Sequence, residues 1–407
     1  MHVVVIGSGP SGLTAAIFAA KNNHQVTILE KNDKIGKKLL MTGNGKCNYF
    51  NSDMNIQHYY STNQELVKDI INEKNINSIL IFLESIGIFP NIKKGYFYPR
   101  NNKAKFVRDA LMEETKLQNI NIEYNFDVLN ITKNNKFIIK STNKEITADK
   151  IIIATGSKAY PNTGSNGKGY ELAKQFNHNI IKPLPGLTPL KCEGNYFNLW
   201  QGARSDALVT LYENDKQLKQ EQGEIQFTDY GLSGICIFNL SSLITRGLYN
   251  KNKEEIHINF LPFLKTNNVD KTIAYLDKQS EIITGRKLYL FLQTFVEEKL
   301  AKTILKVTAI DENKYYDELN KKEKYRLVQN LISFKIKAVE SKGFEHSQVC
   351  SGGVSLNEIN SKTMESKKEK GLYIIGELLD VNGDCGGYNL AFAFISGMLA
   401  GKGVSND

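Results

Sequence analysis

The chain has 407 residues, a formal net charge of +9, 41% hydrophobic residues and 23% charged residues. These values are typical of a globular protein with a large core, and the longest apolar runs are too short to cross a bilayer. The first residues show no signal-peptide pattern, so we expect a cytoplasmic protein with no membrane segment. The five cysteines and six histidines are scattered, which argues against a disulfide scaffold and leads us to expect no metal.

The positive charge is compatible with phosphates, nucleic acid or anionic substrates. The lysines, however, are spread along the chain, as in "KNNK" and "NKKEKYR", and are not gathered with aromatic residues. This distribution favours an ordinary solvated surface. Nucleic acid is therefore not the expected partner, although an RNA substrate stays open as an alternative.

The first predicted element is a short β-branched run, Val3–Ile6, which suits a parallel strand buried on both faces. It leads into a GxGxxG pattern formed by Gly7, Gly9 and Gly12. In this pattern the first glycine permits a tight turn and the second lets the backbone approach a pyrophosphate. The third lets the following helix pack closely on the strand.

A helix and an acidic residue follow the glycine pattern. The helix is predicted over Leu13–Ala20, and its N-terminus would lend partial positive charge to phosphates. A second strand, Gln25–Leu29, ends at Glu30, a carboxylate suited to an adenosine ribose. The unit therefore predicts a dinucleotide site and leaves NAD and FAD as alternatives.

The next glycine-rich segment, Gly36–Asn51, follows closely on this acidic residue. In a plain NAD dehydrogenase the chain usually proceeds from the acidic residue to the next helix. Here it has small residues and amides that suit a loop passing close to a bound ring or pyrophosphate: Thr42, Gly43, Asn44, Gly45 and Asn48.

A third glycine-rich segment begins with a predicted strand, Lys150–Ile153, and the turn Ala154–Gly156, which can pass close to a dinucleotide. The pattern GSNGKG at 164–169 then precedes a predicted helix, Tyr170–Phe176. Pro161 interrupts the strand that should lead into this pattern. A separate NAD-binding loop and a structural turn therefore both stay open for these three glycines.

The last glycine-rich segment lies near the C-terminus. A predicted strand, Leu372–Ile375, leads into Glu377, Asp380 and the pair Gly386–Gly387, and a helix is predicted over Asn389–Leu399. An acidic side chain after a buried strand can bind the ribityl hydroxyls of a flavin. The helix start can face the pyrimidine end of the flavin ring, where negative charge develops on reduction. FAD would thus reach from the N-terminal glycine loop to this one.

Together these motifs resemble the bacterial BaiN-like, or aminoacetone oxidase-like, NAD(P)/FAD-dependent oxidoreductases, which are relatives of the glutathione reductase-type flavoproteins. The resemblance rests on the N-terminal glycine pattern and on "KLLMTGNGKCN", "ATGSKAYPNTGSNGKGYELA", "GEIQFTDYGLSG" and "GELLDVNGDCGGYNLAFAFISG". Lys46 and Ala391-Phe392 depart from the family pattern, in which we expect Arg and Gln-Trp. The resemblance implies an α/β fold with a discontinuous, Rossmann-like FAD-binding domain, whose parallel sheet is built from both termini.

The middle of the chain would be inserted into this domain. Strand-like runs at Ala207–Tyr212 and Glu255–Phe260 indicate a β-rich part, and amphipathic Lys/Glu/Leu-rich stretches after residue 265 indicate a helical part. We predict the first part of the FAD-binding domain at 1–190, an inserted β-rich domain at 191–264, a small helical subdomain at 265–330, return strands of the β-rich domain at 331–350 and the C-terminal part of the FAD-binding domain at 351–407.

The motifs and the resemblance together give the expected cofactor-binding residues. These are Gly7, Ser8, Gly9, Pro10, Ser11, Gly12, Glu30, Lys31, Lys38, Thr42, Gly43, Asn44, Gly45, Asn48, Val128, Ala154, Thr155, Gly156, Gly376, Glu377, Asp380, Gly386, Gly387, Tyr388, Asn389 and Leu390.

No catalytic residue is identified from the sequence, and three weak candidates stay open. Cys47 follows the ribose-binding acid, where disulfide reductases carry a cysteine pair, but no second cysteine stands nearby, so a packing role is favoured. Asp229 and Tyr230 lie in a segment that the resemblance places close to the cofactor, and either could act as a general acid. For this segment we favour a strand-to-helix turn in which Gly231 gives backbone freedom and Ser233 caps the helix.

We expect a flavoenzyme that is reduced by NADH or NADPH and acts on a small organic molecule. The resemblance implies C=C reduction or amine oxidation. No histidine lies between Glu30 and His58, where related fumarate reductase-like enzymes carry a covalent flavin link, so we predict non-covalent FAD. A flavin oxidase that uses oxygen, an RNA-modifying flavoprotein and a flavin-binding sensor without turnover are the alternatives. The oligomeric state does not follow from the sequence.

Overall fold

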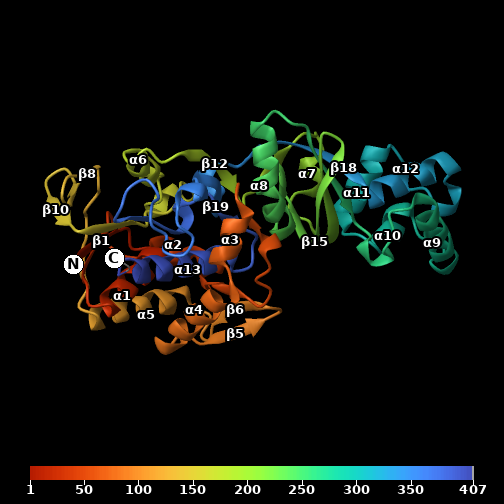
Figure 1. Cartoon of the computed structure of the whole chain (residues 1–407). Helices are drawn as coiled ribbons and strands as arrows, with labels where there is room; N and C mark the ends of the chain where they lie inside the picture. Colours follow the sequence, from red (N-terminus) through yellow and green to blue (C-terminus); the bar gives the residue numbers. More distant parts are fainter. Residues whose placement is uncertain (406–407) are drawn as a thin grey trace. The chain divides into compact units, whose positions relative to one another are not determined.

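The structure is a computed structural model that describes residues 1–405, and the chain divides into two compact units (Figure 1). Unit 1 combines both ends of the chain, Met1–Pro185 and the segment from Phe344 onward, and unit 2 is Gly186–Gly343. The finer five-part division stays a prediction. Within residues 1–405, no helix is both long and apolar enough to span a membrane.

Unit 1 is built on a five-stranded sheet in the order β20-β11-β1-β2-β7. Its strands are β1 (His2–Ile6), β2 (Gln25–Leu29), β7 (Asn121–Glu123), β11 (Lys150–Ile153) and β20 (Leu372–Ile374). Every neighbouring pair is parallel, so all five carboxyl ends lie at one edge of the sheet. The four strands predicted for this sheet are confirmed to within one residue. Their β-branched side chains suit a sheet that is covered on both faces.

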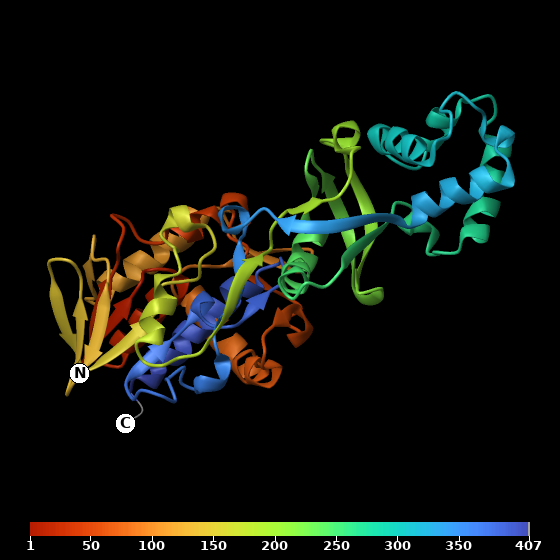
Figure 2. The same ribbon diagram turned by 90° about the horizontal axis from the view of Figure 1, so that it is seen from above.

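The helices at the two ends of the chain, α1 (Pro10–Lys21) and α13 (Tyr388–Gly403), pack against each other beside this sheet (Figures 1 and 2). A Cβ at Gly397 would lie 2.4 Å from the Ser11 carbonyl oxygen, and one at Gly401 would lie 2.5 Å from that of Ala15. These glycines therefore allow the two helix backbones to touch. The other helices of unit 1 are α2 (Lys37–Met41), α3 (Gln64–Ile70), α4 (Glu73–Ser85), α5 (Ala104–Leu117) and α6 (Lys168–Lys174).

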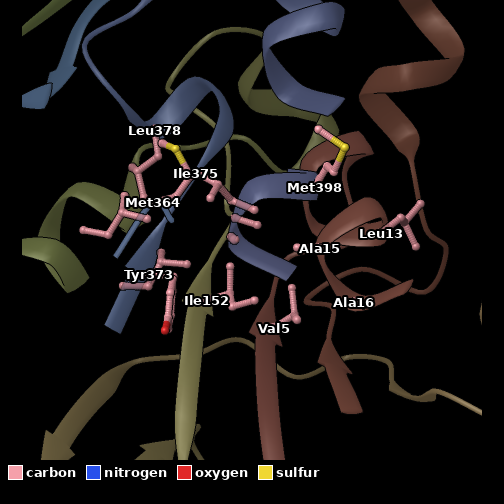
Figure 3. Packing of buried hydrophobic residues seen from close by; sticks show 14 of the residues in the cluster. Val5, Leu13, Ala15, Ala16, Ile152, Met364, Tyr373, Ile375, Leu378 and Met398 are labelled. Carbon is pink, nitrogen blue, oxygen red and sulfur yellow. The ribbon is translucent and has the colours of Figure 1, made fainter. Parts of the chain in front are cut away.

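The core of unit 1 lies between the sheet and these helices. Figure 3 shows Val5, Ile152 and Tyr373 from three neighbouring strands, with Leu13 of α1 and Met398 of α13 near them. All five side chains are fully buried. Residues from both ends of the chain therefore share one core.

Smaller antiparallel sheets complete unit 1. They are β8 (Asn130–Lys133) with β9 (Phe137–Lys140) and β10 (Glu145–Ala148), β3 (Phe50–Asn51) with β6 (Tyr96–Pro99) and β5 (Pro90–Lys93), and β4 (Tyr59–Tyr60) with β21 (Asn382–Gly383). A further two-stranded sheet joins β12 (Ile180–Gly186) and β19 (Val349–Val354).

Unit 2 contains a closed barrel with the strand order β13-β16-β15-β14-β17-β18. The strands are β13 (Leu190–Cys192), β14 (Arg204–Glu213), β15 (Lys216–Phe227), β16 (Gly231–Ser233), β17 (Glu254–Asn259) and β18 (Phe334–Ser341). The helices are α7 (Phe197–Trp200), α8 (Ile235–Tyr249), α9 (Val269–Ile282), α10 (Leu288–Leu292), α11 (Glu298–Thr308) and α12 (Lys321–Ile332). Trp200 is fully buried against Phe227 and Phe334, at ring-centroid distances of 4.8 and 5.7 Å.

One acidic side chain is buried in unit 2. Glu254 starts β17 and is 1% exposed, and within residues 1–405 no group donates a hydrogen bond to its carboxylate. A Cβ at Gly247 would lie 1.7 Å from Glu254 Oε1 and 2.9 Å from Glu213 Oε2, so both carboxylates lie against this glycine. Burial and the neighbouring Glu213 raise the pKa of Glu254 to about 8. The folded protein therefore holds this proton up to a much higher pH than the unfolded chain does.

Because the pKa of Glu254 is raised, the free energy of unfolding should fall as the pH rises. Because the folded pKa lies above the unfolded value, the stabilising contribution is complete below the unfolded pKa of 4.5 and is lost as the pH rises to about 8. We expect Glu254→Gln to raise the free energy of unfolding at pH 8 by roughly 2–4 kcal/mol and to leave it nearly unchanged at pH 4. Urea unfolding at both pH values measures this difference.

The matched control is Glu255→Gln, one position along the same strand, where the carboxylate pairs with His257 Nε2 at 2.7 Å. This control should not gain stability at pH 8. Equal stability of wild type and Glu254→Gln at both pH values would show that Glu254 carries no shifted proton.

Candidate cofactor site

The predicted cofactor segments meet at the carboxyl edge of the parallel sheet. β1 leads into Gly7, β2 into Glu30, β11 into Ala154 and β20 toward Gly376. Because these strands are neighbours and parallel, the four segments that follow them lie at one edge. In doubly wound α/β proteins this edge is where nucleotides bind.

The N-terminal glycines form a cradle in which each has a different role. A Cβ at Gly7 would lie 2.5 Å from the Ala154 carbonyl oxygen, and one at Gly12 would lie 2.0 Å from that of Gly7. A Cβ at Gly9, in contrast, would meet no atom of the described residues within 4 Å. Gly9 is also the N-cap of α1, whose first turn has no side-chain cap and no acidic residue. The arrangement fits a pyrophosphate against the backbone and the helix start.

Glu30 is held in a fixed orientation at the end of β2. Its carboxylate accepts hydrogen bonds from the Ser8 N–H (3.1 Å) and the Ser8 hydroxyl, and from the Asn32 N–H (2.8 Å) and side-chain amide (2.7 Å). The Phe126 N–H donates to the Glu30 carbonyl at 3.0 Å, so the segment that contains the buried Val128 runs alongside. Oriented in this way, the carboxylate can accept hydrogen bonds from a ribose.

The segment Gly36–Asn51, predicted as a loop, contains the short helix α2 and a 3₁₀ turn, Thr42–Gly45. Gly43 and Asn44 both have left-handed backbone angles, with φ of 55° and 54°. The Asn48 amide faces the carbonyl oxygens of Phe50 and Phe97 at 3.0 and 3.2 Å, so it holds the loop in place.

Cys47 is fully buried in this segment, and burial raises the pKa of its thiol to about 12. A thiol in this state is inert as a nucleophile. Packing is therefore the role that the structure favours for Cys47.

One ion pair joins α2 to the C-terminal segment. The Lys38 ammonium lies 2.5 Å from Glu377 Oε2, and the Ser157 hydroxyl donates to the same oxygen at 3.0 Å. Lys38 and Glu377 are each 22% exposed. Three glycine-rich segments that are far apart in the sequence therefore meet at one carboxylate.

The C-terminal segment passes close to α1 and ends at the start of α13. Gly376 has a φ of 67°, and a Cβ there would lie 2.5 Å from the Ser11 hydroxyl oxygen. α13 begins at Tyr388 with Gly387 as its N-cap, without a side-chain cap or an acidic residue in its first turn. Leu390 lies in that turn and is partly buried. The helix start fits the negative charge that develops at the pyrimidine end of a flavin.

Two predicted cofactor contacts of this segment also hold the loop together. The buried Asp380 carboxylate accepts hydrogen bonds from the Thr62 N–H at 2.9 Å and the Thr62 hydroxyl at 2.6 Å. Asn389 accepts from the Gly383 N–H at 2.8 Å and donates to its carbonyl at 2.9 Å. Both side chains thus have protein partners, and their contact with a cofactor stays a prediction.

The GSNGKG pattern packs against the segments that follow β2 and β11. No strand leads into it, since Pro161–Thr163 form a 3₁₀ turn. A Cβ at Gly164 would lie 2.6 Å from Asn32 Nδ2 and 3.0 Å from Lys31 Cε. A Cβ at Gly169 would lie 1.9 Å from Thr155 Oγ1. Of the two alternatives for these glycines, the structure favours the structural turn.

The weak acid candidates lie in unit 2. Asp229 and Tyr230 occupy the turn between β15 and β16, where the Thr228 N–H donates to the Gly231 carbonyl at 3.0 Å. Burial raises the pKa of Tyr230. The predicted cap was wrong, because Ser233 ends β16 and the N-cap of α8 is Gly234, which has no side chain to accept a hydrogen bond.

Several residues around the site were not among the predicted contacts. Ser157 follows the Ala154–Gly156 turn directly, so extending that motif by one residue would have included it. Thr62 and His58, which bind acidic side chains of the C-terminal segment, carry no such signal. Among residues 1–405, no group of three or more His, Cys, Asp or Glu side chains is placed to hold a metal ion.

Comparison with known proteins gives the family. A model described as the HI0933-like protein Rossmann domain matches residues 1–403. The chain belongs to this family. It is 35% identical to the 3-dehydro-bile acid delta(4,6)-reductase of Clostridium scindens over 99% of both chains. It is 27% identical to the ribosomal RNA dihydrouridine synthase of Escherichia coli, over 97% of this chain and 95% of that protein.

A solved structure supports the fold of this HI0933-like protein. The 3-ketosteroid-Δ4-(5α)-dehydrogenase of Rhodococcus jostii RHA1 superposes with a TM-score of 0.51 and 14% identity, covering 100% of this chain and 96% of that one. The chain is an oxidoreductase with a Rossmann-type FAD-binding domain. The open cradle at Gly9, the oriented Glu30 and the uncapped starts of α1 and α13 fit FAD.

The glycine cradle can be tested with two substitutions that differ only in position. Gly9→Val should leave the melting temperature of the cofactor-free protein nearly unchanged, because a Cβ there meets no atom of the described residues within 4 Å. It should weaken FAD binding at least about tenfold, since the methyl groups would fill the backbone cradle. Differential scanning fluorimetry and a flavin fluorescence titration measure the two effects.

Gly12→Val is the control. Its Cβ would clash with the Gly7 carbonyl, so it should destabilise the fold itself. Unchanged FAD affinity in Gly9→Val would place the pyrophosphate elsewhere.

Proposed function

We propose that this protein is an FAD-dependent reductase that takes hydride from NADH or NADPH and saturates a C=C bond conjugated to a carbonyl group in a small organic molecule. The observation that best supports FAD as the cofactor is the contact of Lys38 and Ser157 with Glu377. It brings the N-terminal, middle and C-terminal segments to one point. The reaction class is supported by the relatives of the family. In this proposal the FAD is not covalently attached.

FAD, when bound, supplies the hydride chemistry, and the protein supplies position and electrostatics. In this assignment the backbone at Gly9 and the start of α1 would hold the pyrophosphate, and Glu30 would bind the adenosine ribose. Glu377, paired with Lys38, would bind the ribityl hydroxyls. The start of α13 would stabilise the negative charge that reduction adds to the flavin.

The reaction class follows from what two full-length relatives share. One is named for reducing the delta(4,6) double bonds of a 3-dehydro bile acid, and the other for making dihydrouridine in ribosomal RNA. In both substrates, the unsaturated 3-dehydro bile acid and uridine, the double bond is conjugated to a carbonyl group. This carbonyl group accepts negative charge when hydride adds to the far carbon of the double bond. The same hydride acceptor chemistry therefore serves both, and C=C reduction is favoured over amine oxidation.

A small molecule is favoured over RNA as the substrate. The identity to the bile acid reductase (35%) exceeds that to the RNA-modifying relative (27%). The net charge of +9 and the second relative nevertheless favour RNA as the next candidate. In that case the reaction would be the same and the acceptor would be a uridine.

The proposal predicts a two-stage spectral change. Under anaerobic conditions, NADH or NADPH should bleach the oxidised flavin absorption within seconds to minutes. A steroid with a conjugated 3-keto-Δ4,6 system should then restore that absorption, and its saturated analogue should not. Stopped-flow absorbance at the flavin maximum follows both stages, with a free FAD solution as the control.

Other results would identify the alternatives. Reoxidation by ribosomal RNA and not by the steroid would make the protein an RNA-modifying enzyme. Rapid reoxidation by oxygen with an amine as the only effective reductant would make it an oxidase. A flavin that neither nicotinamide reduces would contradict the proposed electron donor.

A further inference from the structure

A polar cluster surrounds His58 at the start of α13. β4 pairs antiparallel with β21, and the Asp384 N–H donates to the His58 carbonyl at 2.9 Å. A Cβ at Gly383 would lie 2.6 Å from Tyr388 Cβ, so only a glycine lets the strand pass this close to the helix start. The short ladder therefore fixes His58 opposite Asp384 and beside Tyr388.

Both ring nitrogens of His58 face carboxylates. Nδ1 lies 3.1 Å from Asp384 Oδ2, and Nε2 lies 3.2 Å from Asp53 Oδ2. Asp384 is 5% exposed, His58 is 32% exposed and Asp53 is 67% exposed. The cluster therefore runs from solvent at Asp53 to a buried carboxylate at Asp384. An imidazolium can donate to both carboxylates, whereas a neutral imidazole donates from only one nitrogen.

The cluster also contacts the start of α13. The His58 ring stacks on Tyr388, with 4.6 Å between centroids and 19° between the planes. The Tyr60 hydroxyl donates to Asp384 at 3.0 Å, and the Tyr59 hydroxyl donates to the Tyr388 carbonyl at 3.1 Å. Tyr388 is the first residue of α13. The groups that face His58 are thus Asp53 from the preceding loop, Asp384 from the C-terminal segment and the Tyr388 ring.

The net charge of this cluster depends on one proton. With His58 neutral, the two carboxylates give a charge of −2; with His58 protonated the charge is −1. Histidine is the side chain that ordinarily exchanges its proton near neutral pH. Because the cluster adjoins the helix start that the proposed function gives to the flavin, its charge acts at the place where reduction adds negative charge.

We propose that His58 is a positioning residue whose protonation controls how readily the bound FAD is reduced. This inference rests on the proposed function. Transfer of a hydride (two electrons and one proton) from the nicotinamide coenzyme leaves NAD(P)⁺ and one negative charge on the flavin. His58 takes its own proton from solvent at the exposed side of the cluster. Protonated His58 offsets one negative charge and so favours the reduced cofactor.

The test measures the equilibrium between oxidised and reduced FAD in the purified holoenzyme against a reference redox dye. The ratio of reduced to oxidised FAD is compared with that of wild type at the same pH, from pH 6 to 8.5, which cancels the pH dependence of the flavin and the dye. The variants are His58→Gln, which is neutral at every pH, and His58→Lys, which stays positive throughout. His24→Gln is the control, because His24 precedes β2 at the opposite edge of the sheet.

Opposite pH profiles are expected for the two variants. His58→Gln should reduce the ratio at least about threefold at pH 6 and match wild type at pH 8.5. His58→Lys should match wild type at pH 6 and exceed it at least about threefold at pH 8.5. His24→Gln should match wild type throughout. Equal offsets in Gln and Lys at every pH, or no effect in either, would overturn the inference.

Asp53→Asn is a second test, and it should not disturb the packing of the protein interior because the Asp53 side chain is mostly exposed. Removing its negative charge should raise the ratio at every pH, and an unchanged ratio would overturn the inference. The dye equilibrium does not use a nicotinamide coenzyme, so the two proposals fail separately. A wild-type protein that binds no FAD would overturn both the proposed function and the role of His58. If wild type binds FAD and is reduced by NAD(P)H, but the His58 variants do not change the ratio of reduced to oxidised FAD, only the role of His58 is overturned.

Discussion

The close approach of α1 and α13 is the constraint on which unit 1 depends. Gly397 and Gly401 let α13 lie directly on the main chain of Ser11 and Ala15, at distances that a Cβ would forbid. This contact brings the two ends of the chain into one core and places two uncapped helix starts at one edge of the parallel sheet. The candidate cofactor site therefore depends on helix packing between residues far apart in the sequence, such as Ser11 and Gly397.

Contacts of acidic side chains in the C-terminal segment add to this helix packing. Lys38 and Ser157 meet at Glu377, Thr62 binds Asp380, and His58 lies between two carboxylates. Each of these contacts joins the C-terminal segment to an earlier part of the chain. In the proposed site, binding of FAD by both termini would therefore require the whole of unit 1 to be folded, because no single segment holds all of these contacts.

The parallel sheet and its glycine turns could be predicted because their signals are local. Val3–Ile6 and Lys150–Ile153 are β-branched runs that end in glycine turns, and both strands lie where the sequence placed them. The pairing of Tyr59–Tyr60 with Asn382–Gly383 could not be predicted in this way. Strands of two residues carry no repeating pattern, and tertiary packing decides how they pair. The same holds for the contact of His58 with Asp384, which lies 326 positions further along the chain. Long-range contacts of this kind have no signature in a single sequence.

The most direct test is the identity of the flavin that the protein retains. The purified protein is incubated with an equimolar mixture of FAD and FMN and desalted, and the bound flavin is released and identified by chromatography. A site built from both ends of the chain needs the adenosine half for the N-terminal glycine loop, so the account predicts FAD at one per chain. Retention of FMN, or of neither flavin, would contradict it.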